Sequence, residues 1–117
     1  MKENDLRERT KKFALRIIRL ATKLPSHASA KVIGNQVLRS GTSVGAQYRE
    51  AFRAKSSADY ISKLTGCLQE LEETQYWLEL LIESDIIKLS MLEGLIGETN
   101  ELIAILTSIV LKVKSKR

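Results

Sequence analysis

The feature that most constrains the fold is a helical repeat that passes without interruption through a cluster of glycine, serine and threonine residues between Arg39 and Ala51. Such clusters normally mark turns. Here, however, apolar or small residues recur every three or four positions, which is the period of an α-helix. They are Ile33, Val37, Gly41, Val44, Tyr48 and Phe52. We therefore predict one helix through the whole segment.

The glycines of this helix fall on its apolar side. Placed at about 100° per residue, Gly34, Gly41 and Gly45 share a face with the apolar repeat. A glycine in a helix interior costs about 1 kcal/mol relative to alanine, whereas two small residues four positions apart let helix backbones approach closely. The segment lacks the lysine of a phosphate-binding loop. We therefore predict that these glycines serve helix packing.

The same three- and four-residue period recurs along the rest of the chain, and no segment alternates with the period of two that strands show. The pattern predicts helices over residues 5–23, 29–55, 57–84 and 90–114. Because the connections are short, neighbouring helices should be antiparallel. We predict an all-α fold, an antiparallel up-down-up-down four-helix bundle, in a single domain over residues 1–117.

The apolar stripes also predict which sides of the last two helices face the core. The third helix carries Ile61, Leu64, Leu68, Leu71, Gln75, Leu78 and Ile82 on one side. The fourth carries Leu92, Ile96, Thr99, Ile103, Leu106, Val110 and Val113. Both helices are expected to begin with a capping box, at Ser56 and at Ser90, and a serine near His27 is expected to cap the second helix.

A second apolar patch on the third helix predicts self-association. Tyr76, Trp77 and Leu80 project away from its core stripe and adjoin one another at helical spacing. Contiguous aromatic and apolar residues on a surface often mark an interface. Ile105 and Leu111 leave the main stripe of the fourth helix in the same way. The alternative is that a loop or a chain end folds over the patch.

The net charge of +5 is unevenly distributed. Acids gather on the third helix, whereas an uninterrupted row of cations, about 21 Å long at 1.5 Å per residue, runs along the first. We call this row the basic ridge; it comprises Arg9, Lys12, Arg16, Arg19 and Lys23. The second helix adds Arg39, Arg49 and Arg53 on its non-core side.

Two interpretations of these cations stay open at this point. In the first, they bind the phosphates of RNA or DNA without sequence preference. In the second, they form salt bridges with the acidic helix, within the bundle or between subunits, and the protein is a structural or protein-interaction scaffold. No groove-reading motif or stacking platform accompanies the cations.

The sequence holds no catalytic or metal-binding constellation. His27 is the only histidine and Cys67 the only cysteine, so neither a catalytic triad nor a zinc site has its side chains. The Glu-x-x-His motifs of a di-iron bundle are missing as well. We expect no enzyme activity, no cofactor and no metal, and we expect Cys67 to be a buried apolar residue.

The expected location is the cytoplasm. Arg16 and Arg19 interrupt the only apolar stretch that could belong to a signal peptide. The apolar run between Leu102 and Val113 is too short to cross a bilayer. A single cysteine, which cannot form an internal disulfide, suits a reducing compartment. We therefore expect a soluble protein with no membrane partner.

Three blocks, at residues 39–51, 53–61 and 71–81, together identify a family resemblance. They resemble the bacterial four-helix bundle proteins, which include the proteins encoded by intervening sequences in large-subunit ribosomal RNA genes. The resemblance extends from about Leu6 to Ile109. Between Ser43 and Ala51 many members instead have a stretch like Ser-Ile-Pro-Ala-Asn-Ile-Ala-Glu-Gly, so this chain, with Gly45 in place of the proline, belongs to a divergent branch.

The resemblance implies an antiparallel four-helix bundle that assembles as a homopentamer. More remotely, the chain is similar to the accessory protein of diversity-generating retroelements, a basic pentameric barrel that partners a reverse transcriptase and binds nucleic acid. The implied partners are therefore RNA or DNA, or a nucleic-acid enzyme such as a reverse transcriptase. The family supplies no catalytic residues.

Overall fold

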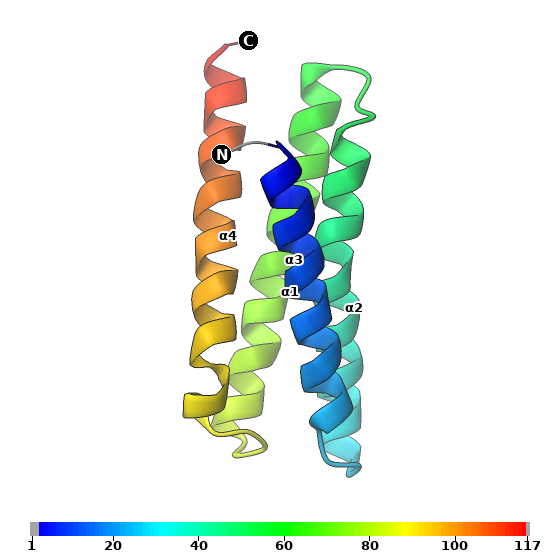
Figure 1. Ribbon diagram of the computed structural model, residues 1–117, viewed down its shortest axis with the longest axis vertical. Coiled ribbons are helices and arrows are strands. Elements are labelled where there is room, and N and C mark those ends of the chain that lie inside the picture. Colours follow the sequence, from blue (N-terminus) through cyan, green and yellow to red (C-terminus); the bar gives the residue numbers. More distant parts are fainter. Residues whose placement is uncertain (1–2, 117) are drawn as a thin grey trace.

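The computed structural model describes residues 3–116, which form an elongated bundle of four helices about 48 Å long. The helices are α1 (Glu3–Lys23), α2 (Ala28–Ala51), α3 (Ser57–Glu83) and α4 (Leu89–Ser115), and no strand occurs among the described residues. Both ends of the chain lie at the same end of the bundle (Figure 1). The all-α four-helix bundle predicted from the sequence is confirmed, while residues 1, 2 and 117 of the predicted domain lie outside the described residues.

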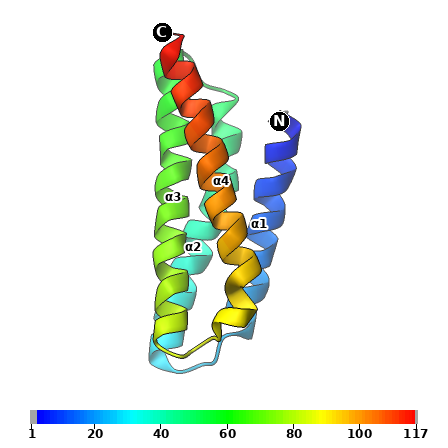
Figure 2. The same ribbon diagram turned by 90° about the vertical axis from the view of Figure 1, so that its left-hand side faces the viewer.

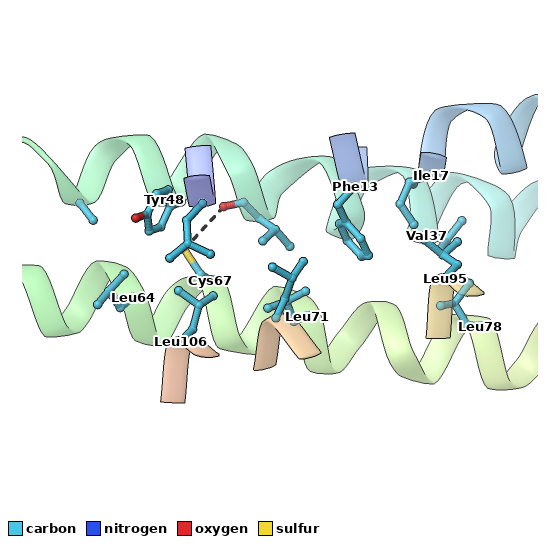
Figure 3. Packing of buried hydrophobic residues seen from close by; sticks show 14 of the residues in the cluster. Phe13, Ile17, Val37, Tyr48, Leu64, Cys67, Leu71, Leu78, Leu95 and Leu106 are labelled. Carbon is cyan, nitrogen blue, oxygen red and sulfur yellow. Dashed lines mark hydrogen bonds between the residues drawn. The ribbon is translucent and has the colours of Figure 1, made fainter. Parts of the chain in front are cut away.

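Helices α2 and α3 run in opposite directions. In the buried contact between α2 and α3, the hydroxyls of Ser40 and Thr74 lie 2.8 Å apart. One turn further along α2, the carbonyl oxygen of Val44 accepts a hydrogen bond from Cys67 Sγ at 3.5 Å (Figure 3). The α3 partner moves back along the chain as α2 advances, so the two helices are antiparallel.

The bundle is packed unevenly. Contacts are extensive between α2 and α3, α1 and α2, and α3 and α4, but α1 and α4 touch little. Figure 2 shows α4 inclined to α1 rather than lying along it. The flank of α1 that faces α4 is therefore left partly open.

The predicted core stripes of α3 and α4 are confirmed in part, because the following predicted residues are buried: Ile61, Leu64, Leu71, Leu78, Leu92, Thr99, Leu106 and Val110. The remainder of the core side differs. Cys67, Thr74 and Leu81 are buried on α3, and Leu95 and Leu102 on α4. The expected Leu68, Gln75, Ile82, Ile96 and Ile103 are only half-buried, on the flanks. On both helices the apolar residues cover an arc wide enough that either the predicted or the observed side could face the core. The observed setting gives inward polar groups buried partners, since Thr74 bonds Ser40 and the Glu70 carbonyl oxygen.

The second helix is shorter than the predicted 29–55, because it ends at Ala51. The residues that follow form the N-terminal cap of α3. Ser56 has an extended backbone, its Oγ accepts a hydrogen bond from the Asp59 N–H at 3.0 Å, and the Lys55 N–H donates to Asp59 Oδ2 at 3.1 Å. This reciprocal capping at the predicted Ser56 position is incompatible with a helix that continues to Lys55.

The other two caps differ from expectation. His27, not a serine, caps α2, because its Nδ1 accepts a hydrogen bond from the Ala30 N–H at 3.3 Å. Helix α4 begins with Lys88 as its N-cap and has no side-chain cap bond, so the capping box expected at Ser90 is wrong. The only histidine is thereby assigned to helix initiation.

Helix α4 is the one described helix that is long and apolar enough to cross a membrane, with a mean hydropathy of 1.4 in its most apolar window. Its buried side packs on the core through Leu92, Leu95, Leu102 and Leu106. Core helices meet the same test of length and composition, so this one helix does not indicate a membrane protein.

Candidate nucleic-acid interface

The basic ridge lies on the flank of α1 that faces α4. Three ridge residues, Arg16, Arg19 and Lys23, line one shallow groove together with residues of α4. Arg16 reaches α4 itself, because its Nη2 would lie 3.1 Å from a Cβ built on Gly94. Because α1 and α4 touch little, the ridge borders an open seam of the bundle and is not buried in a contact between helices.

Arg9, at the start of the ridge, is occupied by α4. Its Nε and Nη2 donate to the two carboxylate oxygens of Glu98, each at 2.8 Å, and Nη2 also lies 2.7 Å from Glu101 Oε1. These hydrogen bonds, that to Glu98 first, raise the pKa of Arg9 above its ordinary value. A bidentate pair of this kind fixes orientation as well as charge. The sequence did not identify these two acids as partners, because it does not say which side of α4 faces α1.

The other four ridge residues are free. Lys12, Arg16, Arg19 and Lys23 are all exposed. None of them forms a salt bridge with a carboxylate of residues 5–116. The ridge therefore presents an array of uncompensated cations along α1.

Arg39 belongs to a different surface. It lies between α2 and α3, where its guanidinium pairs with Glu73 and, at 3.3 Å, with Glu70. The hydrogen bond to Glu73 is the main cause of the raised pKa of Arg39. This pairing with the acidic helix is the arrangement that the scaffold interpretation expects.

Arg49 and Arg53 lie apart from the ridge as well. Arg49 lines a hollow between α1 and α2 together with Lys11, whereas Arg53 is exposed in the connection after α2. The eight cations proposed from the sequence are thus not brought together into one surface. The largest group of unpaired cations among them consists of four ridge residues, Lys12, Arg16, Arg19 and Lys23.

The three glycines of α2 lie where α1 crosses it, and all three are buried. A Cβ on Gly41 would lie 2.7 Å from Ile17 Cγ1, and one on Gly34 would lie 3.0 Å from Leu24 Cδ1. At Gly45 the nearest atom is Thr10 Oγ1, at 3.3 Å. The close approach of α1 to α2, which fixes the position of the ridge, therefore depends on Gly41 most strongly.

The residues predicted to form a subunit interface differ in exposure. Tyr76 is 52% exposed and meets the Trp77 ring edge-on at 5.1 Å. Trp77 packs partly against the core, and its buried Nε1 has no hydrogen-bond partner among the described residues. Leu80 is half-buried. On α4, Leu111 is also a large exposed apolar residue, at 61% exposure.

The groups that could carry chemistry are engaged elsewhere. The Cys67 thiol is fully buried, and burial raises its pKa to about 12. His27 serves as a helix cap. Among the described side chains, those of residues 5–116, histidine, cysteine, aspartate and glutamate nowhere gather in a group of three that could hold a metal ion.

Taken together, these features define a four-helix bundle of net charge +5 with a row of exposed cations along α1. Residues 2–108 match the sequence profile of the family described as 23S rRNA-intervening sequence protein, and the chain belongs to this family.

A solved structure supports the same assignment. It is the crystal structure of a protein of unknown function from the S23 ribosomal protein family of Bacteroides thetaiotaomicron, which is 42% identical to this chain. The match covers 94% of this chain and 98% of that one, with a TM-score of 0.87. Among curated proteins no relative matches the chain.

Proposed function

We propose that this protein is a non-enzymatic, homo-oligomeric accessory protein that binds RNA or DNA through the basic ridge of α1. The observation that carries the proposal is the unpaired state of Lys12, Arg16, Arg19 and Lys23 on an open flank of the bundle. Successive cations three and four residues apart match the repeated charge of a phosphate backbone better than they match one small anion.

The pairing pattern separates two groups of basic residues. Arg9 and Arg39 hold helices together and are assigned a structural role. The remaining ridge residues are not assigned such a role, because none of them forms an ion pair with another helix among residues 5–116. Nucleic acid, or an enzyme that carries nucleic acid, is the partner that their charge favours.

Self-association is the second part of the proposal. Tyr76 and Leu111 are large apolar side chains with more than half of their surface exposed, and α4 carries further half-buried isoleucines. Exposed apolar and aromatic surface of this extent favours an interface. The family resemblance makes a pentamer the expected assembly, which would multiply the number of ridges available to one nucleic-acid strand.

The test compares two double variants of α1 with the same change in charge. Arg16→Gln with Arg19→Gln removes ridge cations, whereas Arg7→Gln with Lys11→Gln removes exposed cations from other sides of the same helix. Fluorescence anisotropy with labelled RNA and DNA should show at least a roughly tenfold loss of affinity for the ridge variant only. Equal losses in both variants, or no binding by the wild type, would contradict the proposal.

An alternative function is a structural or protein-interaction scaffold without nucleic-acid binding. The ion pairs of Arg9 with Glu98 and of Arg39 with Glu73 favour it. Under this alternative the protein assembles normally, and the ridge variant behaves like wild type in every nucleic-acid titration. Light scattering on the same samples separates loss of binding from loss of assembly.

A further inference from the structure

The basic ridge runs beside an apolar groove at the end of the bundle where α1 ends and α4 begins. The groove has a volume of about 230 Å³, and Arg16, Arg19 and Lys23 form its basic side. No carboxylate is among its lining residues in the described part of the chain. Its floor and opposite wall are apolar and consist of Leu20, Ile87, Met91, Leu92 and Leu95.

The groove is accessible and its cations are in position. Met91, on the α4 side, is 69% exposed. On the other side, Arg16 extends over Gly94, where the missing side chain leaves space for the guanidinium. A planar guanidinium at the edge of an apolar floor can stack on a nucleobase while a neighbouring cation holds the adjacent phosphate.

We propose that this groove receives one unstacked base of a single-stranded nucleic acid whose phosphates follow the basic ridge. The inference rests on the proposed function and names its substrate class. The volume is below the roughly 300 Å³ at which pockets for drug-sized ligands begin, which suits one flat base rather than a larger ligand. In a duplex the bases are paired and stacked inside, so the apolar floor would have nothing to bind.

Charge complementarity favours a nucleic-acid strand over an acidic peptide as the ligand of this groove. Of the four free cations, Arg16, Arg19 and Lys23 line the groove, and Lys12 extends the row along α1 beyond it. A polyanion with a charge at every repeat uses this whole length. An acidic peptide would use chiefly the groove.

The experiment measures fluorescence anisotropy of the full-length protein with four probes at one salt concentration. They are a single strand of about 12 nucleotides, within the usual range of single-strand sites, the matching duplex, the same strand with stable abasic positions, and a glutamate-rich peptide with one phenylalanine. The single strand should bind roughly tenfold more tightly than the duplex, and abasic positions should abolish this difference.

A groove variant and a matched control locate the effect. Met91→Gln makes the groove polar and should remove the preference for single strands, whereas Leu89→Gln changes an exposed apolar residue of the same helix outside the groove. Equal affinity for duplex and single strand, or tighter binding of the peptide, would overturn the groove proposal alone. Absence of binding to every nucleic-acid probe would overturn the proposed function together with it.

Discussion

Ile17 of α1 lies directly over Gly41 of α2, so closely that a Cβ at position 41 would stand 2.7 Å from Ile17 Cγ1 and 2.8 Å from Cγ2. Both residues are fully or almost fully buried. The side chain of Ile17 therefore occupies the space that any other residue at position 41 would need. This contact sets the distance between α1 and α2.

Gly41→Ala should destabilise the protein although alanine favours helices. Overpacking costs about 1 to 3 kcal/mol, which outweighs the gain of about 1 kcal/mol in helix propensity. Gly97→Ala is the control, because a Cβ there meets no atom within 4 Å apart from the local backbone of its own helix, and it should stabilise by about 0.5 to 1 kcal/mol. Urea denaturation measures both. A Gly41→Ala variant as stable as Gly97→Ala would show that the helices do not meet this closely.

The Cys67 thiol predicts a loss of stability at alkaline pH. Burial raises its pKa from the ordinary 9.0 to about 12, so the unfolded chain loses this proton at lower pH than the folded protein. Stability from this group is complete below about pH 9 and declines as the pH rises towards 12. At about pH 10.5 the decline should amount to up to about 2 kcal/mol.

Cys67→Ala isolates this contribution, because lysines and tyrosines titrate in both proteins. The fall in unfolding free energy between about pH 7 and about pH 10.5 should be smaller in the variant than in wild type. The thiol should also react with a thiol reagent only after denaturation. Rapid reaction of the native protein would place Cys67 at the surface and contradict the packing of α2 against α3.

The contact between Arg9 and Glu98 should contribute to stability, whereas the rest of the ridge should not. Both side chains are mostly shielded from water, at 23% and 17% exposure, so the pair is worth about 1 kcal/mol. A double-mutant cycle with Arg9→Gln and Glu98→Gln measures this coupling. The same cycle with Lys12→Gln in place of Arg9→Gln should give none. A coupling near zero in the first cycle would refute the structural role of Arg9.

The fold could be predicted from the sequence because helical periodicity is strong in all four segments, and the glycines of α2 fit that period better than they fit a turn. The end of α2 at Ala51 could not be predicted, because it depends on the local competition between continuing α2 and forming the Ser56 cap of α3. The core side of α3 could be predicted in part, including the burial of Cys67. Thr74 could not be placed in the core, because in the sequence it is less clearly apolar than Leu68, which lies on the flank.

The candidate site was predictable only in part. Spacing alone places the five ridge cations on one side of α1. Which of them remain free depends on the acids of another helix, and the spacing of Glu98 and Glu101 gives no sign that they face Arg9. The groove could not be predicted from the sequence, because residues far apart in the chain, such as Leu20 and Met91, line it together.

Assembly should depend on exposed apolar residues of α3 and α4. Tyr76→Ser combined with Leu111→Gln should reduce the mass of the oligomer, towards that of the 13.2 kDa chain, because both side chains are more than half exposed. Val32→Thr on α2 is the control, since Val32 is equally exposed but lies outside the proposed interface. Light scattering provides the mass. An unchanged mass in the double variant would exclude this surface as the interface.

The salt dependence of nucleic-acid binding tests the central claim most directly. For single strands the logarithm of the affinity falls with the logarithm of salt concentration with a slope of about −0.7 per neutralised phosphate. Four free ridge cations predict a slope of about −3. The Arg16→Gln, Arg19→Gln variant should reduce it to about −1.5, and the Arg7→Gln, Lys11→Gln control should leave it unchanged. A wild-type slope near zero, or an equal reduction in both variants, would contradict nucleic-acid binding by the basic ridge.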